Sequence, residues 1–203
     1  MTTIDVSDGR RQRGDATRRK VARAAAMIAT THGLDSISVG ALAAATGVSK
    51  SGILTVFGTR EAILLAAVAE ARNIYIEEVL SAVYQAGPGA PRLRALMDSW
   101  VDYLHAGVFP GGCFIAATTA EYGRRSGPVA DAVRDLKREW LTVLETELSA
   151  AGSPRPAADA FTIDALLTAG NMRRELFADD AELARAKDLA MGVVNQLPCS
   201  AGD

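Results

Sequence analysis

The segment from Ser38 to Phe57, SVGALAAATGVSKSGILTVF, constrains the fold more than any other part of the chain. Two short apolar stretches of helical spacing are separated there by Gly47, Val48 and Ser49. Glycine favours the positive φ that ends a helix, and the serines at 38 and 49 suit the N-caps of the two helices. Because the break is only about three residues long, the helices must cross closely, which predicts a helix-turn-helix.

The second helix of this motif has an inward and an outward face. Ile53, Val56 and Phe57 follow the i, i+3, i+4 spacing and are expected to face the protein interior. The outward face then consists of Lys50, Ser51, Gly52, Leu54 and Thr55. A helix exposed in this way at its N-terminal end can enter a DNA major groove. The alternative is an ordinary helical hairpin in a bundle, and the flanking residues favour the DNA-binding interpretation.

Those flanking residues also carry a family resemblance. The matching pieces are His32-Gly33-Leu34, Ser38-Val39, the run from Ala45 to Lys50, and Phe57-Gly58-Thr59-Arg60-Glu61. Together they resemble the N-terminal domain of the tetracycline-repressor (TetR) family of transcriptional regulators, over residues 17–65. The resemblance implies sequence-specific regulation of transcription through a double-stranded DNA operator. One departure is Leu54, which stands where the family often has an aromatic residue.

A second stretch, from Phe109 to Leu141, is similar to a body-domain pattern in a subset of TetR-like regulators. It contains Gly111-Gly112-Cys113 before a helix of small residues and then the turn Gly127-Pro128. The resemblance implies two parts, a DNA-binding head at residues 1–60 and a ligand-binding, dimerising body at residues 61–203. In that family the expected function is repression released by a small apolar organic ligand. The alternative is a helical small-molecule binding protein that does not bind DNA.

The composition favours an all-α fold. Apolar residues make up 49% of the chain, alanine and leucine dominate them, and β-type alternation is almost absent. Residues 1–15 are expected to form a flexible arm, in which Arg10, Arg11 and Arg13 either approach DNA phosphates or are simply solvated. Residues 198–203 are expected to be frayed. Outside the motif, helices are predicted at 17–31, 60–85, 92–106, 115–122, 129–150, 157–177 and 179–197.

Charge is divided unevenly along the chain, although the net charge is only −2. Residues 1–60 hold nine Lys and Arg against four Asp and Glu, which gives +5. The remaining residues hold thirteen against twenty, which gives −7. A basic head on an acidic body places the expected nucleic-acid contact at one end of the protein.

Particular residues of the head are expected to contact DNA. Lys50 and Thr55 are predicted to face base edges, while Ser51 and Gly52 allow a close backbone approach. Four further residues are predicted to hold phosphates. These are Arg18, Ser38, Ser49 and Arg60.

Aromatic residues of the body suggest a ligand pocket. They occur on helices that we expect to be neighbours, together with a few polar groups, and such a mixture suits a small organic molecule. For any single residue, plain core packing is the alternative. The predicted pocket residues are Trp100, Tyr103, Leu104, Phe109, Phe114, Thr118, Trp140 and Asn171.

The last two predicted helices carry more apolar surface than one small body should hide, so a homodimer is expected through them. The residues concerned are Leu166, Leu167, Met172, Leu176, Leu183, Leu189, Val193 and Val194, with Ala169, Gly170 and Ala190 as small residues for close crossing.

Other function classes find little support. The two cysteines, Cys113 and Cys199, lack metal-ligand spacing, and no nucleophile, base and acid stand at motif distances. Cys113 is best interpreted as a small buried hydrophobe, with a redox sensor as the alternative. No apolar run approaches ~20 residues and no secretory pattern opens the chain. We therefore expect a cytoplasmic protein without membrane contact, metal, cofactor or catalytic activity.

Overall fold

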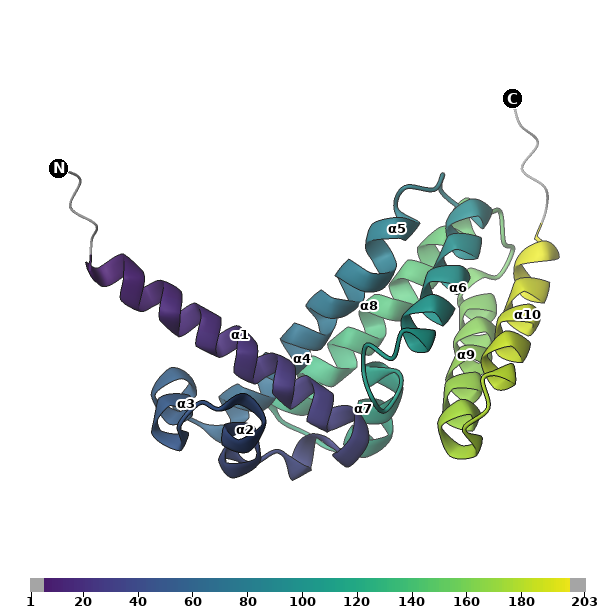
Figure 1. Cartoon of the computed structure of the whole chain (residues 1–203). Helices are drawn as coiled ribbons and strands as arrows, with labels where there is room; N and C mark the ends of the chain where they lie inside the picture. Colours follow the sequence, from purple (N-terminus) through teal and green to yellow (C-terminus); the bar gives the residue numbers. More distant parts are fainter. Residues whose placement is uncertain (1–5, 198–203) are drawn as a thin grey trace.

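A computed structural model describes residues 6–197, with side chains from residue 14 onward. Within these residues every regular element is a helix, as the composition predicts. The head contains α1 (Val6–His32), a short 3-10 turn (Leu34–Ser36), α2 (Val39–Thr46) and α3 (Lys50–Phe57). In Figure 1, α1 crosses above α2 and α3, and its N-terminal half extends beyond them.

The beginning of α1 corrects one expectation. The helix starts at Val6, so residues 6–15 are not a flexible arm. Arginine and alanine are good helix formers, and Gly9 and Gly14 cost only about 1 kcal/mol each in a helix that tertiary packing already holds. That packing comes from Val21 and Ala25, which are fully buried. Residues 1–5, the side chains of Arg10, Arg11 and Arg13, and the fraying expected at 198–203 all lie outside the described part.

The caps predicted for the motif are confirmed. The Ser38 hydroxyl accepts a hydrogen bond from the Ala41 amide at 3.1 Å, and Ser49 accepts one from the Gly52 amide at 3.0 Å. Gly47 ends α2 in the left-handed region with φ of 69°, which costs glycine nothing. The turn bends the chain by 112° between α2 and α3. Local sequence alone therefore builds the helix-turn-helix.

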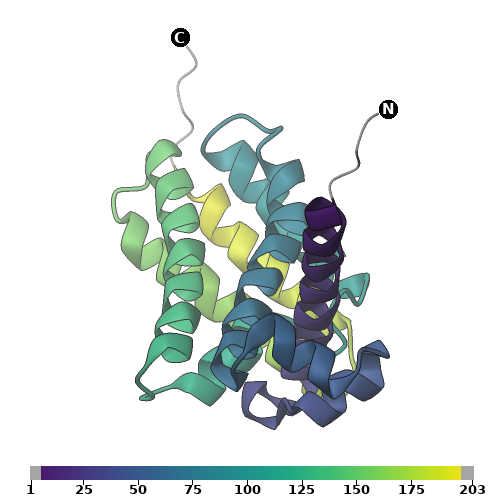
Figure 2. The ribbon, with the colours of Figure 1, turned by 90° about the vertical axis from the view of Figure 1, so that its left-hand side faces the viewer.

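The body is a bundle of longer helices, which Figures 1 and 2 show from two sides. Its elements are α4 (Arg60–Tyr75), a π-helical segment (Ile76–Leu80), α5 (Ser81–Val83), α6 (Ala90–His105), α7 (Phe114–Tyr122), α8 (Pro128–Ala150), α9 (Pro156–Phe177) and α10 (Ala181–Asn195). The helix expected at 60–85 is thus interrupted by the π-helical segment. The core lies between α4, α6 and α8, where Leu93, Leu96, Met97, Leu144 and Leu148 are fully buried.

The outer layer of the body consists of α9 and α10, which pack against each other (Figure 1). Gly170 faces Ala186 so closely that a side chain at 170 would collide with it. Gly170 therefore serves a crossing within one chain, whereas Ala169 is exposed. Leu167, Leu183 and Val194 are buried within the chain and cannot form a dimer surface, contrary to expectation.

A different set of apolar side chains on these two helices remains exposed. They are Phe161, Met172, Leu176, Phe177 and Leu189, of which Phe161 is 73% and Leu176 76% exposed. Along the described residues, no single helix is long and apolar enough to span a membrane. The bent pair α2–α3 meets that test by length and composition only.

Candidate functional site

The outward face of α3 has the form that the sequence predicts. Ile53 and Phe57 are buried, whereas Lys50, Ser51 and Thr55 are exposed and Leu54 is 47% exposed. The Thr55 hydroxyl donates to the Ser51 carbonyl at 2.8 Å, which satisfies its proton within the helix. Gly52 lies in the first turn of α3 and is half-buried. The face combines a cation, small polar groups and one leucine, a set able to contact phosphates, base edges and thymine methyl groups.

The residues predicted to hold phosphates surround this face, and two of them also hold the head together. Arg18 Nη2 donates to the Val56 carbonyl at 2.8 Å, and its guanidinium lies 4.9 Å from the centre of the Phe57 ring. Arg60 donates to the carbonyls of Ile37 at 3.1 Å and Asp35 at 2.6 Å. A guanidinium has five N–H donors, so each of these arginines keeps donors for a phosphate. Ser38 and Ser49 use their oxygens as caps.

The head is joined to the body through α7. The Glu121 carboxylate accepts hydrogen bonds from the backbone amides of Leu34 at 2.7 Å and Asp35 at 2.8 Å. The Gly111 amide, just before α7, donates to the Thr30 hydroxyl at 3.2 Å. Because α7 also lines the body cavities described below, it contacts both the head and these cavities. The sequence indicated only α4 as a link, since α4 is the covalent one.

Asp35 adds an ionic cluster to this junction. Its carboxylate pairs with Arg125, accepts a hydrogen bond from the Tyr122 hydroxyl at 3.1 Å, and lies 3.9 Å from Arg60. The hydrogen bond from Arg125 is the main reason why the pKa of Asp35 is lowered. Burial, followed by the charge of Asp35, raises the pKa of Tyr122 to about 12.

This cluster predicts how stability depends on acidity. The pKa of Asp35 is lower in the folded protein than in the unfolded chain, where it is about 3.9. Asp35 therefore adds to the free energy of unfolding above about pH 3.9, and this contribution is lost as pH falls through the pKa of the folded state. Half of the side chain is exposed, so the effect is small. In urea unfolding between pH 5 and 2, Asp35→Asn should lose less stability than wild type, while Asp131→Asn, the same change at an exposed pair on α8, should follow wild type. Parallel curves for Asp35→Asn and wild type would contradict the prediction.

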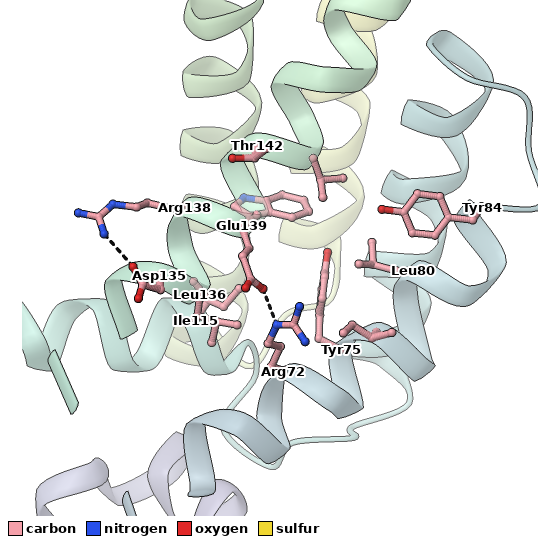
Figure 3. A pocket seen from close by; sticks show the side chains of 13 residues that line it. Arg72, Tyr75, Leu80, Tyr84, Ile115, Asp135, Leu136, Arg138, Glu139 and Thr142 are labelled. Atoms are coloured by element: carbon pink, nitrogen blue, oxygen red, sulfur yellow. Dashed lines mark hydrogen bonds and ion pairs between the residues drawn. The ribbon is translucent and has the colours of Figure 1, made fainter. Parts of the chain in front are cut away.

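The main cavity of the body is a groove of about 710 Å³ between α4, α7 and α8 (Figure 3). Its apolar wall consists of Tyr75, Ile76, Leu80, Tyr84, Ile115, Leu136, Trp140 and Val143, and its polar residues are Arg72, Asp135, Arg138, Glu139 and Thr142. Arg72 pairs with Glu139 at 2.6 Å, and Arg138 pairs with Asp135 at 2.8 Å. The size and the mostly apolar wall are typical of a small-molecule site.

Two smaller hollows lie behind the groove. An inner hollow of about 20 Å³ is lined by residues that include Trp100, Cys113, Trp140 and Asn171. A second hollow of about 10 Å³ is lined by residues that include Tyr103 and Phe114. As they stand, both are too small for an organic ligand. Cys113 is buried in this region, and burial raises the pKa of its thiol, which disfavours the thiolate that a nucleophile or redox sensor needs.

The predicted pocket residues are therefore divided. Trp140 lines the groove, and Trp100, Tyr103, Phe114 and Asn171 line the small hollows. Leu104, Phe109 and Thr118 are buried and line none of these three cavities. Asn171 also has a structural task, because its side-chain oxygen accepts the Cys113 amide at 3.0 Å and fixes the start of α7.

The sequence interpretation missed the groove residues of α4, of the π-helical segment and of the turn after α5. Tyr75 and Tyr84 lie in the region that was interpreted as one long connecting helix. The sequence feature that could have indicated a pocket there is the presence of two aromatic side chains that each carry a hydroxyl. Tyr75 is half-buried, yet its hydroxyl is fully buried and has no hydrogen-bond partner. Burial of this hydroxyl raises its pKa well above the usual range. Leaving such a group unpaired costs roughly 1–3 kcal/mol.

A metal site finds no support in the described region. No group of three or more His, Cys, Asp or Glu side chains there is placed to hold an ion.

Comparison with known proteins gives two family matches. The family described as "Bacterial regulatory proteins, tetR family" matches residues 21–67, and "Tetracyclin repressor-like, C-terminal domain" matches residues 89–190. No curated protein matches the chain.

Solved structures share the whole fold. A TetR transcriptional regulator from Chloroflexus aurantiacus has a TM-score of 0.80 at 23% identity, covering 92% of this chain and 98% of that one. SCO4454 from Streptomyces coelicolor has a TM-score of 0.80 at 20% identity, covering 90% and 96%. AibR, in complex with isovaleryl coenzyme A and operator DNA, has a TM-score of 0.67 at 21% identity, covering 89% and 97%.

Proposed function

Because the chain belongs to the TetR family of transcriptional regulators, we propose that it is a homodimeric repressor that a small apolar organic ligand releases from its operator. The observation that carries the proposal is the pair of regions joined by α7, an exposed recognition helix in a basic head and a groove in the body. We place the functional boundary at the start of α4, with the head at residues 1–60 and the body at residues 61–203. A regulator of transcription acts at the chromosome, so we place the protein in the cytoplasm.

The ligand-binding half of the proposal is supported by the groove and by a solved relative. AibR was solved with both isovaleryl coenzyme A and operator DNA, so a protein of this fold can hold a small molecule and DNA. In the present chain, the groove has room for a drug-sized molecule and an apolar wall that would bury it. Catalysis is not part of the proposal, since the buried Cys113 thiol is the only candidate nucleophile that the sequence offered.

Release requires that the ligand favour a body conformation whose heads no longer match the operator. Its affinity for the two conformations must differ by ~1–3 kcal/mol, and operator DNA must then weaken ligand binding by the same factor. Two structural routes support such coupling. Helix α4 carries Tyr75 and groove residue Arg72 and continues from the head, and α7 carries Ile115 in the groove and Glu121 at the head.

The first experiment is an electrophoretic shift with DNA from upstream of the protein's own gene. A repressor should bind it specifically, and increasing salt should weaken the complex because phosphate contacts release counterions. A protein that binds the ligand but no DNA would instead be the helical binding protein that the sequence left as the alternative.

Lys50 gives the sharper test of the docking face. Replacing it with alanine should cost ~1–3 kcal/mol of operator affinity if it reads a base, and should relax the preference at that base pair. The matched control is Arg155→Ala, which removes an exposed cation from the body. Affinities are measured by fluorescence anisotropy on the operator and on single-base variants. Wild-type affinity in the Lys50 variant would show that another face docks on DNA.

A further inference from the structure

A thin partition separates the groove from the inner hollow. Tyr75, Ile115 and Trp140 line both cavities. Tyr75 and Trp140 meet edge to face, with ring centroids 6.1 Å apart and planes at 89°. In Figure 3 the Tyr75 side chain rises from α4 into the space beneath α8. Movement of this one ring would therefore join the 710 Å³ groove to the hollow behind it.

The hydroxyl of Tyr75 indicates what the joined cavity would take. Across the described side chains, it is the one buried polar atom of a non-exposed residue that lacks a hydrogen-bond partner. A phenol is protonated at physiological pH, and burial raises the pKa of this one further, so it can donate. A ligand with an oxygen acceptor would supply the partner that the protein itself does not.

The backbone beside Tyr75 departs from regular α-helical hydrogen bonding. The π-helical segment begins at the next residue, and the Ser81 amide donates to the Ile76 carbonyl five residues back. The Ile76 amide is shared between the carbonyls of Arg72 and Asn73. Such π-helical turns are rare and are frequently found at functional sites. Ile76 and Leu80, within the segment, also line the groove.

The charges around the groove argue for an uncharged ligand. All four charged residues that line it are already paired, Arg72 with Glu139 and Arg138 with Asp135. Beyond the partition, Lys137 pairs with Asp164 at 2.5 Å, and Trp140 donates to the same carboxylate at 2.7 Å. A charged ligand would have to compete with an existing partner for its counter-ion, so these pairs favour an uncharged ligand.

We propose that the ligand is an uncharged, flat aromatic compound with a carbonyl oxygen, which displaces the Tyr75 ring from the partition and accepts a hydrogen bond from its hydroxyl. This inference rests on the proposed function and adds the ligand class and the residue that selects it. The aromatic rings of Tyr75, Trp140 and Tyr84 provide stacking surfaces for such a compound.

The test uses three probes on the full chain without DNA, with binding measured by equilibrium dialysis. 9-Fluorenone carries the carbonyl, fluorene has a methylene in its place, and 9-fluorenone-4-carboxylate adds a negative charge. One neutral hydrogen bond predicts that fluorenone binds about fivefold more tightly than fluorene. The carboxylate should bind more weakly than fluorenone.

Tyr75→Phe removes only the selecting atom. The variant should lose the preference for fluorenone, so that fluorenone and fluorene bind alike. Without ligand it should melt about 2–4 °C higher than wild type, because an unpaired buried hydroxyl has been removed. A purely structural hydroxyl would give the opposite change in melting temperature. Tyr122→Phe is the matched control, since it removes a hydroxyl that lies outside the groove and is bonded to Asp35 at 3.1 Å. It should keep the preference for fluorenone and should not raise the melting temperature.

Three results would overturn the inference. They are a preference for fluorene or the carboxylate over fluorenone, an unchanged fluorenone preference in Tyr75→Phe, and no binding of any probe. None of these bears on DNA binding, which the shift assay tests separately. Loss of operator binding would instead refute the proposed function and leave the selectivity of the groove intact.

Discussion

Replacing Phe161 and Leu176 together with glutamate should convert the protein into a monomer and abolish tight operator binding. The two side chains are the most exposed large apolar residues of α9, and Met172 lies between them on the same helical stripe. Ala165 and Ala169, also exposed, complete this stripe and leave room for a close approach. A self-complementary patch of this kind is what a two-fold axis requires.

The expected size of the effect follows from burial and avidity. The double variant places four carboxylates in an apolar contact of two protomers, which should raise the dimer dissociation constant by on the order of a hundredfold or more. A dimer reads two half-sites whose centres lie about 34–36 Å apart, or a multiple of that distance. A monomer loses the second site, so operator affinity should fall by on the order of a thousandfold.

Light scattering at micromolar concentration and anisotropy on the operator measure the two effects. The control is Ala69→Glu, which adds a carboxylate to an exposed position of α4 away from the stripe. Circular dichroism should show that the double variant keeps its helices, since both side chains are exposed in the protomer. A double variant that remained a dimer would place the contact on another face.

The second large effect is expected from Glu121→Gln. The glutamate holds two adjacent backbone amides, at 2.7 and 2.8 Å, from a helix that also lines the groove. A glutamine oxygen can accept such bonds without the charge, and its amide group cannot accept at all. Because charge-assisted bonds contribute about 1.5–3 kcal/mol each, the junction between head and body should weaken by about 2 kcal/mol.

The variant should uncouple the two regions. The groove would still bind its ligand, but the ratio of ligand affinities with and without operator should fall toward one. Titration of tryptophan emission measures that ratio, because Trp140 lines the groove. Hydrogen exchange gives an independent readout, since the Leu34 and Asp35 amides should exchange faster.

Glu145→Gln supplies the matched control on the exposed side of α8, and it should change neither the affinity ratio nor the exchange rates. An unchanged affinity ratio in the Glu121 variant would assign the coupling to α4 alone.

The head could be derived from sequence because its determinants are local. Ser38, Ser49 and Thr59 each cap a helix by a bond to the amide three residues on, and Gly47 ends α2 by its own conformation. The spacing of Ile53 and Phe57 fixes which face of α3 points outward. The family resemblance and the helical periodicity also predicted the remaining helices and their order along the chain.

Only the tertiary structure determined the groove, the contact between head and body, and which apolar residues of α9 and α10 are buried or exposed. Glu121 meets Leu34 across 87 positions, and no spacing rule connects them. Periodicity gives the apolar face of a helix but does not show which of its residues pack within the chain. For this reason Leu167 and Leu183 were predicted to lie at the dimer surface, although both are buried in the protomer. A cavity is the space left between packed helices. The position of Tyr75 in the groove therefore depends on how α4 and α8 pack together, which the sequence does not show.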